Sequence, residues 1–259
     1  MDELIRVQRD GVIATVVLNR PHKLNALTKP MWQRLGAVMR ELSDDDTLRC
    51  IVLRGAGGKA FAPGNDIAEF ASERSNFAQG KAYGAVLHAA LGAIADCRHP
   101  TVALIEGICV GGGLEIAALC DLRICGESSR FGVPINKLGL VMAHAELAAL
   151  VQLAGRATAL EMLLEGRVFD AGEALAKRLV NRVVADAQVE AEAYATARRI
   201  AAGAPLVARW HKQFMRQLNA GRALTEAERD EGFRCYDSED FRIGYRAFLA
   251  KEPPGFVGR

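Results

Sequence analysis

Residues 101–125 read TVALIEGICVGGGLEIAALCDLRIC, and this stretch decides the fold class. It opens with the apolar run Thr101–Ile105, which is typical of a buried strand. After the consecutive glycines Gly111–Gly113, residues Leu114–Leu119 have a helical pattern and Leu122–Cys125 is again an apolar run. Strands that alternate with a helix over so short a distance predict an α/β fold whose strands are joined by crossover connections.

The same alternation extends toward the N-terminus. The apolar segments Leu4–Val7 and Ile13–Leu18 flank Arg9-Asp10-Gly11, a combination that predicts a β-hairpin. Hydrophobic periodicity predicts one more strand and two helices, over Cys50–Leu53, Leu27–Leu42 and Tyr83–Ala95.

Beyond about residue 185 the pattern changes to helices alone. Four are predicted: Asp186–Ala202, Pro205–Leu218, Thr225–Tyr236 and Phe241–Ala250. The second has an apolar stripe of Leu206, Trp210, Phe214 and Leu218. Its opposite face holds Arg209, Lys212 and Arg216, which we expect to be solvated. The sequence therefore predicts an α/β core over residues 1–190 and a helical region over residues 191–259.

Composition excludes several classes of protein. The 259 residues include 33 basic and 31 acidic side chains, so a broad surface for nucleic acid or an anionic membrane is not expected. The N-terminus is acidic at once and lacks the apolar segment of a secretory signal. The longest apolar strings, around residues 101–110 and 114–125, are interrupted by glycines and by Glu115 and Asp121. We therefore expect a cytoplasmic protein that makes no membrane contact.

Cysteine and histidine usage points the same way. The 6 cysteines form no Cys-x-x-Cys pair, and without an export signal we expect them to be reduced. The 5 histidines are scattered and do not cluster with cysteines. No metal site is predicted.

The first glycine-rich segment, Gly55–Ala60, loosely fits the dinucleotide pattern Gly-x-Gly-x-x-Gly/Ala. That pattern must open a helix, and here Pro63 and Gly64 follow almost immediately. A Walker-type loop also fails, because Ala60 stands where Ser or Thr is required. We expect a connecting loop at this position and no nucleotide site.

The second glycine-rich segment, Gly111–Gly113, is more informative. Glycines between a strand and a helix let the backbone approach a ligand and leave N–H groups free at the helix start. Such donors suit a carbonyl oxygen that gains negative charge, although the same glycines could serve only for tight packing. Glu115 follows one turn later in apolar sequence, where burial would raise its pKa toward use in acid/base catalysis. A second donor could come from Asn65, directly after the turn at Pro63-Gly64.

Taken together, these segments resemble the crotonase family, also called the enoyl-CoA hydratase/isomerase family. The resemblance covers nearly the whole chain. The matching segments are Leu18–Pro21, Leu24–Leu27, Ala60–Ile67, Gly107, Gly111–Glu115, Ala157–Gly166, Ala174, Val180–Val184, Glu239–Phe241 and Ala247–Lys251.

The resemblance implies a spiral of ββα units followed by a helical region that trimerises, often into dimers of trimers. It implies an enzyme that binds an acyl-CoA thioester and stabilises its enolate, with coenzyme A as part of the substrate and no permanently bound cofactor. By position, the N–H groups of Asn65 and Gly112 would form the oxyanion hole, and Glu115 would match the first catalytic glutamate.

The resemblance also implies a groove for substrate and coenzyme A. The residues it assigns to the groove are Arg20, Lys23, Asn25, Leu27, Pro63, Gly64, Asp66, Ile67, Gly111 and Ile135. From the tail, Phe248 and Lys251 would reach coenzyme A bound to a neighbouring subunit. Lys23 and Lys251 suit its phosphates. Phe70, Phe77, Ile135 and Met142 are expected to line part of the pocket.

The chain departs from the family pattern after Pro134, because Ile135 stands where the hydratases have their second glutamate and the glycine-rich helix start that usually follows is absent. Isoleucine cannot transfer a proton, which leaves three alternatives. Glu115 could act with a displaced partner, either His144 or Glu146. It could also act alone, in isomerisation or in decarboxylation of a malonyl-type thioester. The third alternative is a non-catalytic acyl-CoA-binding homologue, and the function we predict is hydration or isomerisation of an enoyl-CoA.

Overall fold

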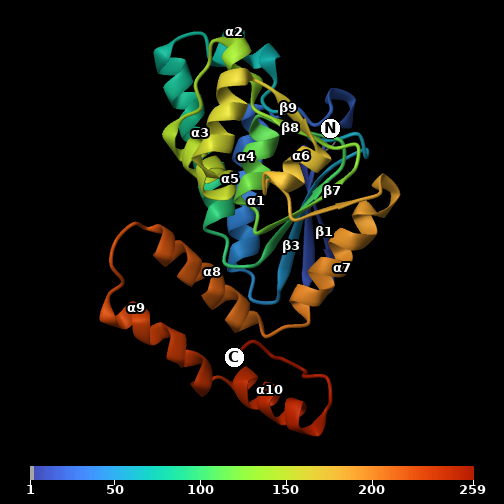
Figure 1. Cartoon of the computed structure of the whole chain (residues 1–259), viewed down its shortest axis with the longest axis vertical. Helices are drawn as coiled ribbons and strands as arrows, with labels where there is room; N and C mark the ends of the chain where they lie inside the picture. The colour runs from blue at the N-terminus through green and yellow to red at the C-terminus, as the bar shows by residue number, and fades with distance from the viewer. Residues whose placement is uncertain (1–2) are drawn as a thin grey trace.

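The larger of the two β-sheets confirms the predicted α/β class. The computed structural model describes residues 3–259. This sheet has six strands in the order β1 (Ile5–Asp10), β2 (Ile13–Leu18), β3 (Cys50–Gly55), β5 (Thr101–Ile105), β7 (Leu122–Gly126) and β10 (Arg182–Val184) (Figure 1). The hairpin β1–β2 is antiparallel as predicted, and every other pair is parallel.

A second, smaller sheet positions the loops that matter for function. Its order is β4 (Ala60–Ala62), β6 (Ile108–Val110), β8 (Arg130–Gly132) and β9 (Val168–Asp170). Strands β4 and β6 are parallel neighbours, so the segments that leave their carboxyl ends lie side by side. These segments are residues 63–67 and 111–113, the two candidate donor loops.

Helices surround these sheets, and most of them bury an apolar face. Those around the core are α1 (Lys29–Asp44), α2 (Phe70–Glu73), α3 (Phe77–Ala95), α4 (Gly112–Leu119) and α6 (Ala171–Ala176). Helix α1 begins after Thr28 and α3 after Asn76, because each of these side chains accepts a hydrogen bond from the first turn. Trp32 and Tyr83 are buried between the helices and the sheets.

Helix α5 (His144–Glu165) is the one helix in the described part of the chain that is long and apolar enough to cross a membrane. The sequence of this helix is not an uninterrupted apolar run, because Glu146 and Arg156 lie within it. Its helical path is broken at Gly155, where φ is 79° and ψ is 162°. Each half is far shorter than the ~20 residues that a bilayer span requires.

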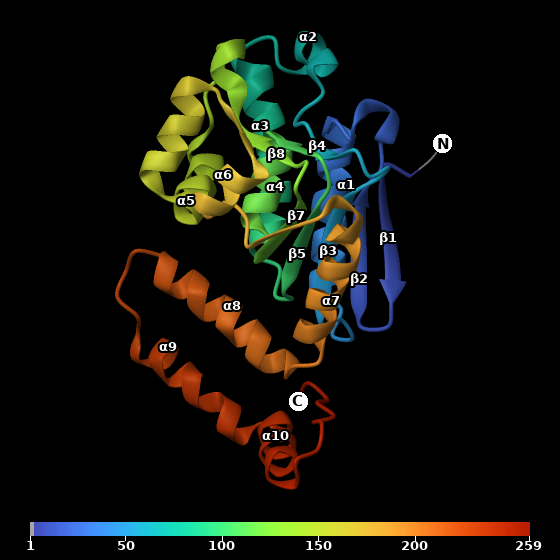
Figure 2. The ribbon, with the colours of Figure 1, turned by 45° about the vertical axis from the view of Figure 1, so that its right-hand side comes forward.

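The C-terminal helices divide into one that belongs to the core and three that leave it. Helix α7 (Val189–Ala201) packs its buried face on the larger sheet, so the predicted division at residue 190 falls inside it. Helices α8 (Pro205–Asn219), α9 (Glu226–Asp230) and α10 (Glu239–Ala250) extend away from the core and form what we call the C-terminal arm (Figures 1 and 2). The predicted helix over Thr225–Tyr236 is α-helical over residues 226–230 and 3₁₀-helical over residues 231–237.

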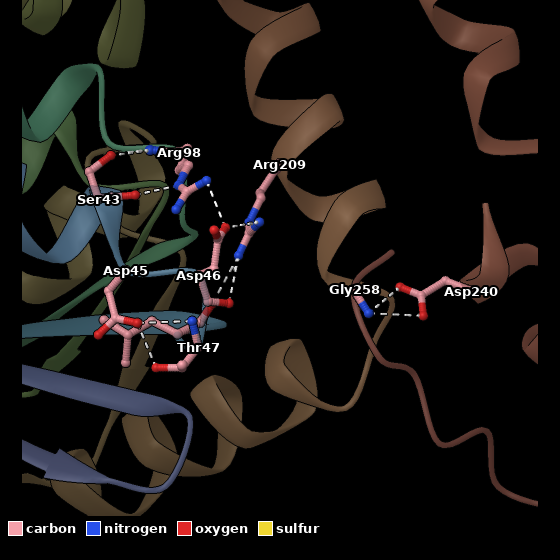
Figure 3. Close-up of polar contacts among 9 residues, drawn as sticks. Ser43, Asp45, Asp46, Thr47, Arg98, Arg209, Asp240 and Gly258 are labelled. Carbon is pink, nitrogen blue, oxygen red and sulfur yellow. Dashed lines mark hydrogen bonds and ion pairs between the residues drawn. The ribbon is translucent and has the colours of Figure 1, made fainter. Parts of the chain in front are cut away.

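The prediction of a solvated basic face on α8 is wrong. Arg209 pairs with Asp46 at 3.2 Å, as Figure 3 shows. Lys212 is 2.8 Å from the Asp121 carboxylate and donates to the His99 carbonyl at 2.7 Å. The basic side chains therefore attach α8 to the core, and Leu218 from the predicted apolar stripe is 61% exposed.

The tail after α10 folds back onto that helix. Asp240 is buried, and its Oδ1 accepts hydrogen bonds from the N–H groups of Val257 at 2.7 Å and Gly258 at 3.1 Å. Figure 3 shows the contact with Gly258. Arg49 of the core donates to the Phe256 carbonyl. The tail is thus attached both to α10 and to the core.

Candidate active site

A cavity of about 180 Å³ lies where the two donor loops meet α4, α5 and the loop before α5. Its polar lining residues are Asn65, Arg74, Glu115 and Glu146. Its apolar walls include Phe70, Leu87, Ile135, Leu140 and Met142. This combination of apolar walls and a few convergent polar groups is typical of a small-molecule site.

The two donor loops touch each other through their glycines. Gly64 has a φ of 106° and Gly111 a φ of 52°, which side chains rarely tolerate. A Cβ on Gly64 would lie 3.2 Å from the Gly112 nitrogen. Within residues 3–259, neither the Asn65 nor the Gly112 N–H donates to a backbone carbonyl. The cavity wall therefore carries two neighbouring backbone donors that are free to bind a ligand oxygen.

The first donor loop is fixed from both sides. The Leu27 N–H donates to the Gly64 carbonyl, and the Asp66 N–H donates to the Leu27 carbonyl, both at 2.8 Å. The Asn65 side chain accepts from Trp32 Nε1 at 2.7 Å and from the Tyr83 hydroxyl at 3.4 Å. These contacts set the direction of the Asn65 N–H, and sequence reasoning had no signal for either aromatic partner.

Glu115 stands in the first turn of α4, one turn from the glycines. Its Oε2 is shielded from solvent and has no hydrogen-bond partner in the described part of the chain. Burial raises the pKa of its carboxyl from 4.5 to about 8, Glu146 adds to the rise, and Arg74 opposes it. The side chain therefore carries a proton at neutral pH and can exchange it with a molecule in the cavity.

Glu146 supplies a second carboxyl group to the same cavity. Its Oε2 accepts from the Ala143 N–H at 2.8 Å, and its Oε1 is 2.8 Å from His88 Nε2. His144, the other displaced partner considered from the sequence, is exposed and does not line the cavity. Of these two alternatives, the structure brings only Glu146 to Glu115.

Three of the four expected pocket residues line the cavity, namely Phe70, Ile135 and Met142. The fourth expectation is wrong, because Phe77 is 86% exposed at the start of α3 and is not part of the lining. The Ile135 side chain, directly after Pro134, forms an apolar part of the cavity wall.

Only some of the residues assigned to the coenzyme A groove line the cavity. Pro63, Gly64, Ile67 and Gly111 line the cavity. Arg20 is 2.6 Å from Asp66, and this ion pair ties the segment after β2 to the first donor loop.

Asn25 and Leu27 are placed differently from the expectation, because neither side chain reaches the surface. Asn25 Nδ2 donates to the carbonyls of Ala56 and Ala60, and its Oδ1 accepts from the Arg20 N–H. Asn25 therefore holds the backbone of this segment, and its side chain is not available to a ligand. Lys23 remains exposed nearby.

The two tail residues lie far from the cavity of their own chain. Phe248 is 83% exposed on α10, and Lys251 follows at the end of that helix. Figures 1 and 2 place α10 at the opposite end of the molecule from α2. Within one chain these residues cannot contact a ligand in the cavity.

Two residues of the site were missed by sequence reasoning. His88 sits in the middle of α3 and looks like any isolated helical histidine, and Arg74 follows the short helix α2. Neither belongs to a motif, and only the tertiary structure brings them to Glu115 and Glu146. Within the described residues 3–259, no group of three or more His, Cys, Asp or Glu side chains is placed to hold a metal ion.

Known proteins resemble this chain over almost its entire length. A sequence profile of the family described as enoyl-CoA hydratase/isomerase matches residues 8–259. A probable enoyl-CoA hydratase of Mycobacterium bovis is 35% identical and covers 99% of both chains. A short-chain-enoyl-CoA hydratase of Clostridium acetobutylicum is 31% identical over 98% of this chain and 97% of its own.

Solved structures agree with these sequence matches. The crystal structure of an enoyl-CoA hydratase/carnitine racemase from Magnetospirillum magneticum is 51% identical to this chain and has a TM-score of 0.98. It covers 100% of this chain, which covers 97% of that structure. A second structure, of a putative family protein from Hyphomonas neptunium, is 35% identical with a TM-score of 0.95, covering 99% of this chain and 98% of its own.

Proposed function

Since the chain belongs to the enoyl-CoA hydratase/isomerase family, we propose that it hydrates or isomerises an enoyl-CoA by stabilising the thioester enolate. The observation that supports this proposal most directly is the pair of free N–H groups, at Asn65 and Gly112, in one cavity with Glu115. The thioester oxygen binds between the two donors, which stabilise the negative charge that develops there. Gly112 adds the positive end of the α4 dipole.

Glu115 is the principal acid/base group in this proposal. For isomerisation, Glu115 reacts in its ionised form, whose fraction grows as pH rises toward 8, and it takes a proton from one carbon of the acyl chain and returns it to another. For hydration, Glu146 takes a proton from the attacking water, whose oxygen bonds to the β-carbon, and protonated Glu115 gives its proton to the α-carbon. Two carboxyl groups with different environments suit this division of roles, and Glu146 replaces the glutamate that Ile135 cannot supply.

Parallel assays of two reactions test the proposal. Hydration of crotonyl-CoA and isomerisation of but-3-enoyl-CoA are measured for the unmodified protein and for Glu115→Gln and Glu146→Gln. We expect Glu115→Gln to lower kcat for both by about 10²–10⁴-fold. Glu146→Gln should lower hydration at least tenfold more than isomerisation, because only hydration needs the second carboxyl.

The matched control is His144→Gln, a neighbouring exposed residue outside the cavity lining. It should leave both rates unchanged. An unchanged rate for Glu115→Gln would exclude Glu115 as the acid/base group. The variant Ile135→Glu restores a carboxyl at the usual family position, and we expect it to increase hydration.

We also propose that the protein associates into trimers or dimers of trimers through the C-terminal arm. Large apolar side chains on the arm are exposed in the single chain: Met215, Leu218, Phe233, Tyr236, Phe241, Tyr245, Phe248 and Leu249. Monomeric proteins rarely expose so many apolar side chains on one segment. In such an assembly Phe248 and Lys251 can approach a neighbour's coenzyme A. A cytoplasmic location stays a prediction.

A further inference from the structure

Arg74 is a cation of the cavity without an anionic partner. It ends the short helix α2, where its N–H donates to the Phe70 carbonyl at 3.1 Å. Its guanidinium carbon lies 4.7 Å from the centre of the Phe70 ring and 4.8 Å from that of Tyr83. Among residues 3–259, no carboxylate lies within 4.0 Å of its side-chain nitrogens.

The two carboxyl groups of the cavity form no ion pair with Arg74. Glu146 is engaged by His88 and by the Ala143 N–H. Glu115 is protonated at neutral pH, since burial raises its pKa to about 8. Arg74 lowers that pKa from its position in the lining, so its charge acts on the cavity interior. Neither carboxyl group of the cavity pairs with Arg74, so the guanidinium remains available to an anionic group of a ligand.

The position of Arg74 also limits what it can bind. Both rings lie within cation–π distance of the guanidinium, whose side-chain N–H groups make no hydrogen bond within residues 3–259 and remain free to donate. A planar fork of donors matches the two oxygens of a carboxylate. Arg74 shares its cavity with Glu115 and with apolar walls such as Leu87 and Met142. The cavity volume of about 180 Å³ suits a short acyl chain.

From these contacts we infer that Arg74 is a specificity-determining residue that binds a carboxylate on the far end of a short acyl chain. The preferred ligands would then be the coenzyme A monothioesters of short dicarboxylic acids, rather than of fatty acids. This inference rests on the proposed acyl-CoA function and names the substrate class of the same site.

The test compares two acyl-CoA ligands that differ mainly in one charge. Binding of glutaryl-CoA, which has a terminal carboxylate, and of hexanoyl-CoA, which does not, is measured by titration calorimetry. The proteins are the unmodified chain, Arg74→Met, Arg74→Lys and the control Lys81→Met. Lys81 is an exposed cation of α3 outside the cavity lining, so its removal changes the net charge equally.

We expect the unmodified protein to bind glutaryl-CoA at least tenfold more tightly than hexanoyl-CoA. Arg74→Met should bring the ratio of the two Kd values close to one, Arg74→Lys should give an intermediate ratio, and Lys81→Met should keep the original one. Thermal melting of each variant shows that it is folded.

The other outcomes overturn the inference in distinguishable ways. Equal binding of both ligands, with the ratio unaffected by Arg74→Met, contradicts the inference and leaves the proposed function intact. Weakening of both ligands by the same factor in Arg74→Met shows that Arg74 contacts the coenzyme A moiety instead. If neither ligand binds to any of the proteins, the proposed function itself fails.

Discussion

The raised pKa of Glu115, which suits proton transfer, also lowers the stability of the folded protein above pH 4.5. Its carboxyl has a pKa of about 8 in the folded protein and an ordinary value of 4.5 when solvated. Between these values the unfolded chain is ionised at this position while the folded chain keeps its proton. The free energy of unfolding therefore falls as pH rises from about 4.5 to about 8.

Replacing Glu115 by glutamine removes this cost. At pH 8 we expect Glu115→Gln to raise the free energy of unfolding by about 4 kcal/mol, and the melting temperature by about 8–16 °C. The gain should shrink toward zero near pH 4.5, as followed by thermal melting across pH. The exposed Glu127→Gln serves as the control, and a gain that does not depend on pH would contradict the assignment.

Gly64 shows how closely one residue controls the donor pair. Gly64→Ala places a Cβ at a φ of 106° and 3.2 Å from the Gly112 nitrogen. We expect stability to fall by about 1–2 kcal/mol. Because the added methyl group contacts one of the two donor nitrogens, kcat should fall at least tenfold. Steady-state kinetics and urea unfolding check both effects.

Gly80→Ala is the matched control for this substitution. Gly80 lies within α3 and has open space where the Cβ would stand. It should become slightly more stable, by about 0.5–1 kcal/mol, without a change in kcat. Equal losses of activity at both positions would show that the donor geometry is not what matters.

At this scale the sequence predicted part of the site. Glu115 and the two donor residues were identifiable because glycines, a turn and a lone acid in apolar sequence each have a local signature. Arg74 and His88 have no such signature, since they reach the cavity from α2 and α3 through tertiary packing. Asn25 was predicted to bind the ligand because its neighbours match a family motif. The buried hydrogen bonds that its side chain makes to the backbone are visible only in three dimensions.

At the scale of elements, the attachment of α8 depends on buried charged contacts. Lys212 is 11% exposed and bridges the Asp121 carboxylate and the His99 carbonyl. Lys212→Met removes both bonds and leaves Asp121 without this partner. We expect a loss of about 1–3 kcal/mol and faster hydrogen exchange in α8.

Arg242→Met is the control, because Arg242 is exposed on α10 and distant from this contact. It should leave exchange in α8 unchanged. If Lys212→Met also leaves exchange in α8 unchanged, apolar packing alone attaches the helix to the core.

Sequence periodicity found the long elements and missed the short ones. Strand β5 matched its prediction because a buried apolar run is bounded by Pro100 and Gly107. The three-residue strands β4, β6 and β8 are too short to show a period of two. On α8 the periodicity correctly predicted a helix but not which face contacts the core. Arg209 and Lys212 bind core residues that are remote in sequence, and Leu218 is exposed because α8 extends from the core.

At the scale of the whole molecule, the C-terminal arm is the segment least able to remain alone in water. We expect light scattering after size exclusion to give the mass of a trimer or hexamer. The double variant Tyr245→Asp with Phe248→Asp should shift the protein toward monomers, because charges oppose apolar association. Phe77→Asp, at an exposed site on the core, should keep the original mass. A monomeric unmodified protein would contradict the proposal.

The overall architecture was largely predictable, because the alternation of strands and helices and the matching motifs extend along nearly the whole chain. The course of the C-terminal arm was not predictable. Helices that pack on their own core and helices that extend from it show the same periodicity. The sequence alone therefore could not show whether the boundary between the core and the C-terminal arm lies within α7 or after it.

The strand order has a consequence for how the chain is made. In both sheets, β1-β2-β3-β5-β7-β10 and β4-β6-β8-β9, neighbours follow the order of synthesis. Each strand can therefore pair with an edge that has already left the ribosome, which releases ~5–20 residues per second. Since β10 ends at Val184, both sheets can be complete before the apolar side chains of residues 205–250 emerge. In the nascent chain, the apolar C-terminal arm is thus exposed only after the two sheets of the core have been able to form.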